Sequence, residues 1–435
     1  MLDAAVGSAD SEYTRSLKRN VWKFYLLKVA WGVRWGTLLP IFAIYFLDRG
    51  ISLTGFMILM ATLNLSSVTS ELPTGLFADR FSRKWSIFVG ALIGCVGVVI
   101  LIFAVDYFVF VLGFILVGVG AAFASGADMA LFYDSIKGAG LEGRVQSLLG
   151  RALAIENISM VGGTLITGAI AGQTGLTGPF WASAASLITA ATIALWFVEP
   201  DIGRDRPASS QPTAFRETAR QYFRHLRATI RTITHNPELV GLVVVYVVLM
   251  RTYFLSERPF GGPYLTSLGF SAADLGFIYA LFYAVMSAFM LGSGRIRAWL
   301  WGSERAALLS LGILGMVSLV VLVNAPLRPI VILGMLGIYV MIGLLHPLMQ
   351  ESLNRRLVSA QRASCLSLVQ ASIYTLGLLV GTPLGAVADN FGLETGLRAF
   401  QWTFVPAILL AAILAWRVLV PSTRRETPAS SSGDG

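Results

Sequence analysis

The sequence predicts an all-α membrane protein with twelve transmembrane helices, arranged as two six-helix halves related by a pseudo-two-fold axis. The first observation is the composition: 55% of the 435 residues are apolar and 13% are charged, and the mean hydropathy is +0.71. Soluble domains hold about 25% charged residues, so this balance excludes a soluble enzyme, a disordered protein and a disulfide scaffold. The other two observations are a series of long apolar runs and an internal repeat.

Twelve apolar runs are long enough to cross a hydrocarbon core of about 30 Å, which takes about 20 helical residues. They are residues 21–47, 52–76, 84–104, 107–133, 148–171, 178–198, 237–260, 271–293, 305–324, 328–350, 364–388 and 396–420. Most connections between the runs are short. The connection after the sixth run is longer and carries a basic stretch from Arg216 to Arg231.

These runs predict five segments: a cytoplasmic N-terminal segment (1–20), a six-helix bundle (21–198), a cytoplasmic linker (199–236), a second six-helix bundle (237–420) and a disordered cytoplasmic tail (421–435). The lysines and arginines indicate the orientation, because they concentrate on the cytoplasmic side of a membrane protein. If the N-terminus lies in the cytoplasm, cytoplasmic segments hold 26 of the 33. We expect a multi-pass protein of the inner (plasma) membrane with both termini in the cytoplasm. The net charge of +9 then indicates anchoring at an anionic leaflet, and no nucleic acid is expected as a partner.

The two halves resemble each other at an offset of 217–219 residues. Residues 168–176 (GAIAGQTGL) match residues 385–393 (GAVADNFGL), and Asp134-Ser135 matches Glu351-Ser352. Gly50-Ile-Ser likewise matches Gly269-Phe-Ser. Three matches in the same order favour a duplication over chance similarity among helices rich in glycine and alanine. Parallel halves of this type are one architecture of secondary transporters.

The loop between the second and third runs, residues 75–84 (GLFADRFSRK), resembles the signature loop of the major facilitator superfamily, G-x-x-x-D-[RK]-x-G-R-[RK]. Ser82 stands where that pattern has glycine. The resemblance covers residues ~20–420 and implies two halves that rock around a central site, with the first, fourth, seventh and tenth helices lining the cavity. It also implies a cytoplasmic latch, whose residues would be Gly75, Asp79, Arg80, Arg83, Lys84 and Asp134.

Two further stretches look like the drug-exporter-like branch of that family: Glu71-Leu-Pro-Thr-Gly75, and the residues Phe132 to Ser135 that close the fourth run. Residues 162–172 resemble the antiporter motif of that branch only loosely, because the proline of the motif is missing. The equivalent loop of the second half, residues 294–305, has lost the aspartate, so we expect the latch to lie mainly in the first half.

Ionisable side chains inside a spanning helix are costly and usually face a cavity or a partner. Arg34 and Arg251 lie mid-span in the first and seventh runs and are separated by the repeat offset of 217. Two guanidinium groups facing each other across a cavity would clamp an anionic substrate, whereas the alternative is local pairing of each arginine. Helical spacing adds Trp31 beside Arg34, and Phe254 beside Arg251.

An aromatic stripe accompanies these arginines on the seventh run. Tyr246, Tyr253 and Glu257 share one helix face there, and Tyr279 and Tyr283 on the eighth run can face them. Aromatic rings with a polar tip suit an amphipathic ligand, although such a stripe also serves simple helix packing. We therefore count these five residues as candidate substrate-binding residues.

The intramembrane acids favour proton coupling. Asp128 is the first candidate for the proton carrier, Glu156 is the second, and Glu71 at the end of the second run is the third. Desolvation favours the protonated form of a carboxyl group at that depth if it is poorly paired. The alternative is a static ion pair, for which Lys28 is the favoured partner. His346 could change its charge near neutral pH, although a structural hydrogen bond is the preferred interpretation.

These observations predict a secondary transporter that works by alternating access, most simply the proton-coupled export of small amphipathic molecules. One alternative is uptake or exchange of a phosphate- or carboxylate-bearing anion through Arg34 and Arg251. Another is a transporter-like receptor or lipid-handling protein without proton coupling. The sequence holds no G-x-x-x-x-G-K-[ST] loop, catalytic triad or metal-ligand spacing, so we expect no enzyme, cofactor or metal. We expect a proton gradient as the energy source, and a small-molecule substrate and the lipid bilayer as partners. We expect the protein to be monomeric.

Overall fold

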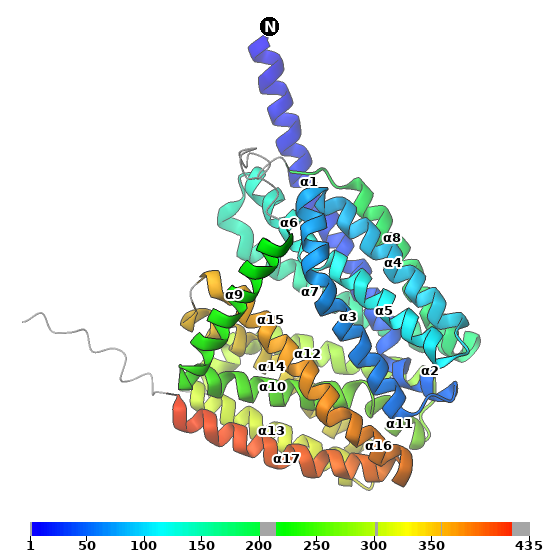
Figure 1. Cartoon of the computed structure of the whole chain (residues 1–435). Coiled ribbons are helices and arrows are strands. Elements are labelled where there is room, and N and C mark those ends of the chain that lie inside the picture. Colours follow the sequence, from blue (N-terminus) through cyan, green and yellow to red (C-terminus); the bar gives the residue numbers. More distant parts are fainter. Residues whose placement is uncertain (1, 201–214, 301–302, 358, 420–435) are drawn as a thin grey trace, which may run out of the picture. The chain divides into compact units, whose positions relative to one another are not determined.

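The computed structural model describes residues 2–200, 215–300, 303–357 and 359–419 (Figure 1). These residues form helices and connecting turns, with no strand among them. The predicted tail at 421–435 and much of the predicted linker lie outside the described residues. The described part of the linker forms one helix, α9 (Phe215–Thr234), which holds the predicted basic stretch.

Eight predicted runs form single helices that start within a few residues of the predicted positions, and several of them extend past the predicted ends. They are α3 (Leu53–Arg80), α4 (Arg83–Phe103), α7 (Val145–Thr174), α8 (Gly178–Trp196), α12 (Ala272–Leu300), α13 (Glu304–Asn324), α14 (Arg328–Arg356) and α17 (Leu393–Val418). Single-turn 3₁₀ segments precede α7 (Glu142–Arg144) and α8 (Gly175–Thr177). The all-α fold is therefore confirmed for the described residues.

The other four runs form interrupted helices. The first comprises α1 (Leu2–Leu38), a 3₁₀ turn (Leu39–Ile41) and α2 (Phe42–Asp48), and the fourth comprises α5 (Tyr107–Ala124) and α6 (Ala127–Gly138). The seventh comprises α10 (Pro237–Glu257) and α11 (Gly261–Ser267). The eleventh comprises α15 (Ser359–Leu376), a π-helical turn (Gly377–Gly381) and α16 (Thr382–Phe391).

Eleven helical segments of the described chain are long and apolar enough to cross a membrane. The longest, Glu142–Trp196, has 55 residues and contains both α7 and α8 around a turn. A single span takes about 20 residues, so this segment supplies two spans. The twelve predicted spans are therefore all present as helices.

Two close backbone contacts join α1 and α7 in the first half. A Cβ on Gly36 of α1 would lie 2.2 Å from the carbonyl oxygen of Met160, and one on Gly163 of α7 would lie 2.7 Å from that of Val33. The absence of side chains at these positions lets the two backbones touch, which is a common way for membrane helices to associate. This contact fixes α1 against α7, the two helices that carry Lys28 and Glu156.

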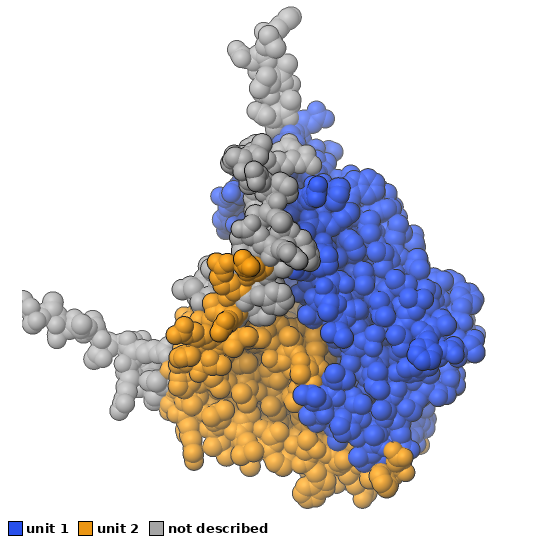
Figure 2. All heavy atoms as spheres, viewed as in Figure 1, with its two compact units in different colours: residues 1–219, 257–284, 378–389 blue, residues 220–256, 285–377, 390–435 orange. Residues whose placement is uncertain are grey.

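The chain divides into two compact units, coloured separately in Figure 2. Unit 1 comprises residues 1–219, 257–284 and 378–389, and unit 2 comprises residues 220–256, 285–377 and 390–435. Unit 1 therefore contains the six spans of the first half together with short parts of the seventh, eighth and eleventh spans. Its core includes a buried cluster of aromatic rings, made by Phe42, Phe46, Phe56, Phe110, Phe114 and Phe180.

Candidate functional site

Three charged side chains meet inside unit 1. Lys28 of α1 lies 3.2 Å from a carboxylate oxygen of Asp128 on α6 and 3.2 Å from one of Glu156 on α7. The Lys28 and Asp128 side chains are 9% and 10% exposed, whereas that of Glu156 is 27% exposed. The first two predicted proton carriers therefore share one lysine, and the side chain of Glu156 is the most exposed of the three.

Local backbone geometry brings these groups together. Gly126 has a φ of +78°, a conformation that favours glycine, and the chain turns there to begin α6 two residues before Asp128. Asp128 Oδ1 accepts a hydrogen bond from the backbone N–H of Met129 at 2.7 Å, which leaves Oδ2 to Lys28. A Cβ on Gly32 would lie 2.3 Å from the carbonyl oxygen of Glu156, so α1 approaches α7 closely one turn beyond Lys28.

The arrangement has unequal charges. With all three groups ionised, two carboxylates face one ammonium group, which leaves one excess negative charge in a largely desolvated place. Burying an uncompensated charge is costly, and binding one proton or one other monovalent cation would neutralise the site. When all three are ionised, these residues, which we call the Lys28 triad, therefore hold one more negative charge than Lys28 neutralises. The predicted alternative of a Lys28 ion pair describes the observed contacts. Proton binding at this site stays a prediction.

Glu71, the third predicted proton carrier, lies on an exposed part of α3. Its described interaction is a backbone one, in which its carbonyl oxygen accepts a hydrogen bond from Thr74 Oγ1 at 3.2 Å. The contacts described for the Lys28 triad do not include it. Glu71 therefore provides a natural comparison residue for experiments on Asp128 and Glu156.

Arg34 is buried in unit 1, with 4% of its surface exposed. Its Cζ lies 5.7 Å from the ring of Trp31 and 4.9 Å from that of Trp35, and a Cβ on Gly94 of α4 would lie 4.0 Å from its Nη2. Its Nε has no hydrogen-bond partner among the described residues. The structure thus provides the predicted contact with Trp31 and leaves the positive charge of Arg34 without a carboxylate in the described part of unit 1.

Arg251 belongs to unit 2 and packs against the π-helical turn of the eleventh span. A Cβ on Gly377 would lie only 2.6 Å from the guanidinium carbon of Arg251, so this position accommodates no larger residue without a shift. Single π-helical turns often mark functional sites in helices. Whether Arg34 and Arg251 form a clamp stays a prediction, because they lie in different units.

The predicted aromatic stripe is divided between the two units. In unit 2, the hydroxyl group of Tyr246 lies 2.8 Å from Nδ1 of His346, and the ring of Tyr253 contacts Tyr339 edge-on at 5.2 Å. Phe254 contacts Tyr253 at 5.3 Å between ring centroids. His346 therefore has the hydrogen bond expected of a structural histidine. The role of these rings in substrate binding stays a prediction.

In unit 1, the tyrosines of the eighth span face Glu257, as predicted. Tyr283 donates a hydrogen bond to the Glu257 carboxylate, and Tyr279 donates one to its backbone carbonyl oxygen at 2.7 Å. The Glu257 carboxylate also accepts from Nε of Arg258 at 3.2 Å, and the Arg258 guanidinium lies 5.8 Å from the ring of Trp35. Glu257 is 1% exposed, so these partners satisfy a fully buried carboxylate.

The predicted latch loop makes some of the contacts expected of it. Arg83 donates a hydrogen bond to Asp134 and a second one to the carbonyl oxygen of Ala130 at 3.1 Å. Three of the other predicted latch residues, Gly75, Asp79 and Arg80, are exposed. Lys84 contributes its backbone N–H to Glu199 at 3.3 Å. The contact between the loop and Asp134 is therefore made by one of the predicted arginines, Arg83.

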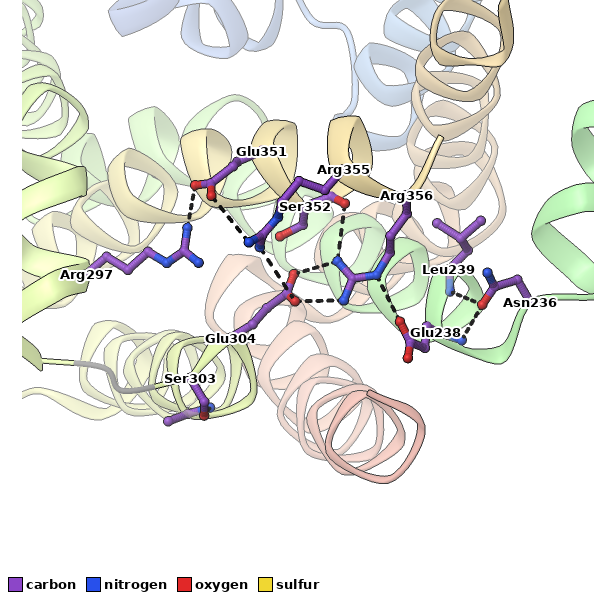
Figure 3. Close-up of polar contacts among 11 residues, drawn as sticks. Asn236, Glu238, Leu239, Arg297, Ser303, Glu304, Glu351, Ser352, Arg355 and Arg356 are labelled. Carbon is purple, nitrogen blue, oxygen red and sulfur yellow. Dashed lines mark hydrogen bonds and ion pairs between the residues drawn. The ribbon is translucent and has the colours of Figure 1, made fainter. Parts of the chain in front are cut away.

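A matching ion-pair cluster stands in unit 2 (Figure 3). Arg297 of the second loop pairs with Glu351, the repeat equivalent of Asp134. Arg356 lies 3.0 Å from Glu238 and 2.8 Å from Glu304, which ties the ends of α10, α13 and α14 together. The missing aspartate in residues 294–305 therefore does not remove the electrostatic link in the second half.

Sequence reasoning missed several of these partners. Glu199 accepts hydrogen bonds from Ser82 Oγ at 2.7 Å and from the Arg83 backbone N–H at 2.9 Å, which holds the latch loop to the end of the sixth span. Glu238 and Glu304 stand in the first turns of their helices, where acidic residues are common. Their place at a helix start could have marked both glutamates as structural residues in the sequence. It does not identify Arg356 as their common partner.

Comparison with known proteins supports the class that this fold defines. The chain is 21% identical over 401 residues to the "Uncharacterized MFS-type transporter YxaM" of Bacillus subtilis, covering 91% of this chain and 95% of that protein. It is 25% identical over 408 residues to the "Inner membrane transport protein YajR" of Escherichia coli, covering 91% and 81%. The crystal structure of a point mutant of the nucleoside transporter NupG superposes with a TM-score of 0.75 at 12% identity, covering 92% of this chain and 100% of that one.

These findings define a polytopic membrane transporter, and not an enzyme. Residues 29–359 match the family profile of the Major Facilitator Superfamily. The chain belongs to that superfamily, and it is a secondary transporter.

Proposed function

We propose that the protein couples proton movement to the export of small amphipathic molecules, and that the Lys28 triad is the proton-binding site. The observation that carries the proposal is the sharing of Lys28 by Asp128 and Glu156, each at 3.2 Å. One lysine neutralises one of these two carboxylates. The remaining negative charge is the feature that binds a proton in one stage of the cycle and releases it in another.

Antiport follows from competition for the same negative charge. A proton at the triad neutralises the site, whereas a cationic amphipathic substrate nearby would neutralise it in the proton's place. Because Glu156 is the most accessible member, it is the group through which the proton enters. Exchange of one proton for one monovalent cation moves no net charge across the membrane. The pH difference therefore drives the outward substrate gradient, at about 1.4 kcal/mol per pH unit.

The test uses purified protein in proteoliposomes with ethidium as the lipophilic cationic probe. A pH gradient should drive ethidium accumulation by the wild type, and Asp128→Asn and Glu156→Gln should each reduce it at least tenfold while ethidium exchange without a gradient continues. Glu71→Gln is the matched control and should transport normally, because Glu71 is exposed. Gradient-driven accumulation at the wild-type level in Asp128→Asn would refute the proposed site. Probe binding with no flux in the wild type would instead favour the receptor class.

A second candidate is proton-linked movement of an organic anion, which the burial of Arg34 favours. Arg34 is 4% exposed and its guanidinium contacts two tryptophan rings, with no carboxylate partner in the described part of unit 1. An anionic group would neutralise Arg34 as a proton neutralises the triad. Carboxyfluorescein uptake driven by a pH gradient, lost in Arg34→Gln and Arg251→Gln, would select this candidate. Ethidium transport that survives Arg34→Gln would select the exporter.

A further inference from the structure

The beginning of α3 is capped by a carboxylate from the far end of the sequence. Asp389, near the end of α16, accepts hydrogen bonds from the backbone N–H of Leu53 at 2.8 Å and of Thr54 at 2.9 Å. The first N–H groups of a helix have no partner within the helix, and a negative charge is favourable at that end. Asp389 therefore joins the eleventh span to the second span inside unit 1.

The two helices also touch closely beside this cap. A Cβ on Gly385, one turn before Asp389, would lie 3.1 Å from Thr54 Cα and 3.1 Å from Met57 Sδ. Such contacts are tighter than side chains normally make, so glycine is what allows α16 to rest on α3. Met57, which lies in this contact, is only 5% exposed. Burial of Met57 thus reports whether α3 and α16 are together.

The repeat supplies a second interface of the same kind, in which the carboxylate is absent. A Cβ on Gly276 of α12 would lie 2.1 Å from the backbone nitrogen of Gly168 on α7. Gly168 and Gly385 are repeat equivalents, and Gly172 is the equivalent of Asp389. Glycine has no side chain with which to cap α12. Of the two matched interfaces, the one between α3 and α16 therefore carries the added carboxylate bonds.

We propose that Asp389 is the gate residue that holds α3 and α16 together, and that its two hydrogen bonds break when this end of the transporter opens. In a transporter of two halves, the access change requires helices of different halves to separate at one end. The α3–α16 contact joins different halves, and its two charge-assisted hydrogen bonds are short and reversible. The lysine and arginine pattern predicts that this end faces the outside of the cell. The proposal rests on the transporter class alone, and no substrate or coupling ion enters it.

The test measures how fast a maleimide labels a cysteine at position 57 in purified full-length protein in detergent. The reporter is Met57→Cys in a background with Cys95→Ser and Cys365→Ser, because those are the two native cysteines. Asp389→Ala should raise the labelling rate at least fivefold, which corresponds to the loss of a typical helix cap. Asp389→Asn, which keeps one acceptor but loses the charge, should give an intermediate rate.

Ser271→Ala is the matched control. Ser271 Oγ accepts from the Asp274 N–H at 3.2 Å at the start of α12, so this variant removes a cap from the equivalent helix start of the second half and leaves the bonds of Asp389 in place. It should leave the labelling rate at position 57 unchanged. Slow labelling of native Cys95 in Asp389→Ala, measured without the reporter, shows that unit 1 remains folded.

Two results would overturn the proposal: wild-type labelling rates in both Asp389 variants, or an equal increase in Ser271→Ala. The first would mean that the carboxylate does not hold α3 and α16 together. The second would mean that position 57 responds to any weakened helix start. Both results are independent of whether Asp128 carries the proton.

Discussion

At the scale of single residues, the charges around Lys28 matter most to the proposed function. It is the cation shared by Asp128 and Glu156, and its Nζ also lies 5.2 Å from the ring of Phe24. Exposed ion pairs contribute little to stability, but removal of one partner from a buried group leaves an uncompensated charge. The three side chains therefore act together, and the effect of substituting one depends on the other two.

Replacement of Lys28 should destabilise the protein more than replacement of either acid. Lys28→Gln leaves two carboxylates facing each other. The free energy of unfolding should fall by about 3 kcal/mol, as is typical when one partner of a buried ion pair is removed. Asp128→Asn leaves a balanced pair of Lys28 with Glu156 and should cost less. Thermal unfolding in detergent measures both variants. The double variant Lys28→Gln with Asp128→Asn should recover part of the loss, and a strictly additive double variant would argue against a shared charge balance.

The latch loop gives a second prediction at this scale. Arg83 binds Asp134 and the carbonyl oxygen of Ala130, whereas Arg80 is exposed beside the ring of Phe81. Arg83→Gln should lower the thermal stability and slow turnover, since a hydrogen bond to a charged group contributes about 1.5–3 kcal/mol. Arg80→Gln should change both properties little. Neither variant should alter the ranking of transported probes, and a changed ranking in Arg83→Gln would place Arg83 in substrate selection.

At the scale of helices, glycine positions decide which faces pack. Gly162 and Gly163 are neighbours on α7, but a Cβ on Gly163 would lie 2.7 Å from the Val33 carbonyl oxygen, whereas one on Gly162 would meet nothing within 4 Å. The backbones of α1 and α7 are therefore in contact along one face only. The Lys28 triad depends on this contact because its members come from α1, α6 and α7.

Alanine substitutions at these two neighbours should have opposite consequences. Gly163→Ala forces α1 and α7 apart and should destabilise the protein by about 1–3 kcal/mol, the usual cost of overpacking. Gly162→Ala should be neutral or slightly stabilising, because alanine favours the helix and the position is open. The melting temperatures of the two detergent-purified variants provide the measurement. Equal melting temperatures would mean that the α1–α7 contact does not set the position of the triad.

At the scale of the whole molecule, the sequence predicts which segments span the membrane far better than it predicts which side chains meet. The apolar runs located all twelve spans, since a helix must satisfy its backbone within the bilayer and its length is set by the bilayer. Lys28 could be foreseen as a partner of Asp128 because both lie inside spans. Lys28 also binds Glu156, because the glycine contact brings α1 and α7 close together. The sequence alone does not predict that contact.

Other contacts could not be predicted because their partners are remote in the sequence. Asp389 caps a helix whose first residue, Leu53, lies 336 positions earlier, and the hydrogen bond between Ser82 and Glu199 spans 117 positions. Nothing in either local sequence identifies the other partner. The interrupted helices were also missed, although Gly126 and Pro40 stand at two of the breaks. Proline and glycine are tolerated in membrane helices, so their presence alone does not predict an interruption.

We propose that Asp128 and Glu156 together bind one exchangeable proton, because Lys28 balances only one of the two carboxylates. Infrared difference spectroscopy of the lipid-reconstituted protein between acidic and alkaline pH tests this directly, since it detects protonated carboxyl groups without any substrate. The wild type and Glu71→Gln should show the same protonated-carboxyl signal, and it should be lost in both Asp128→Asn and Glu156→Gln, because either variant leaves a balanced pair. A signal that persists unchanged in both of these variants would mean that Asp128 and Glu156 do not bind the proton.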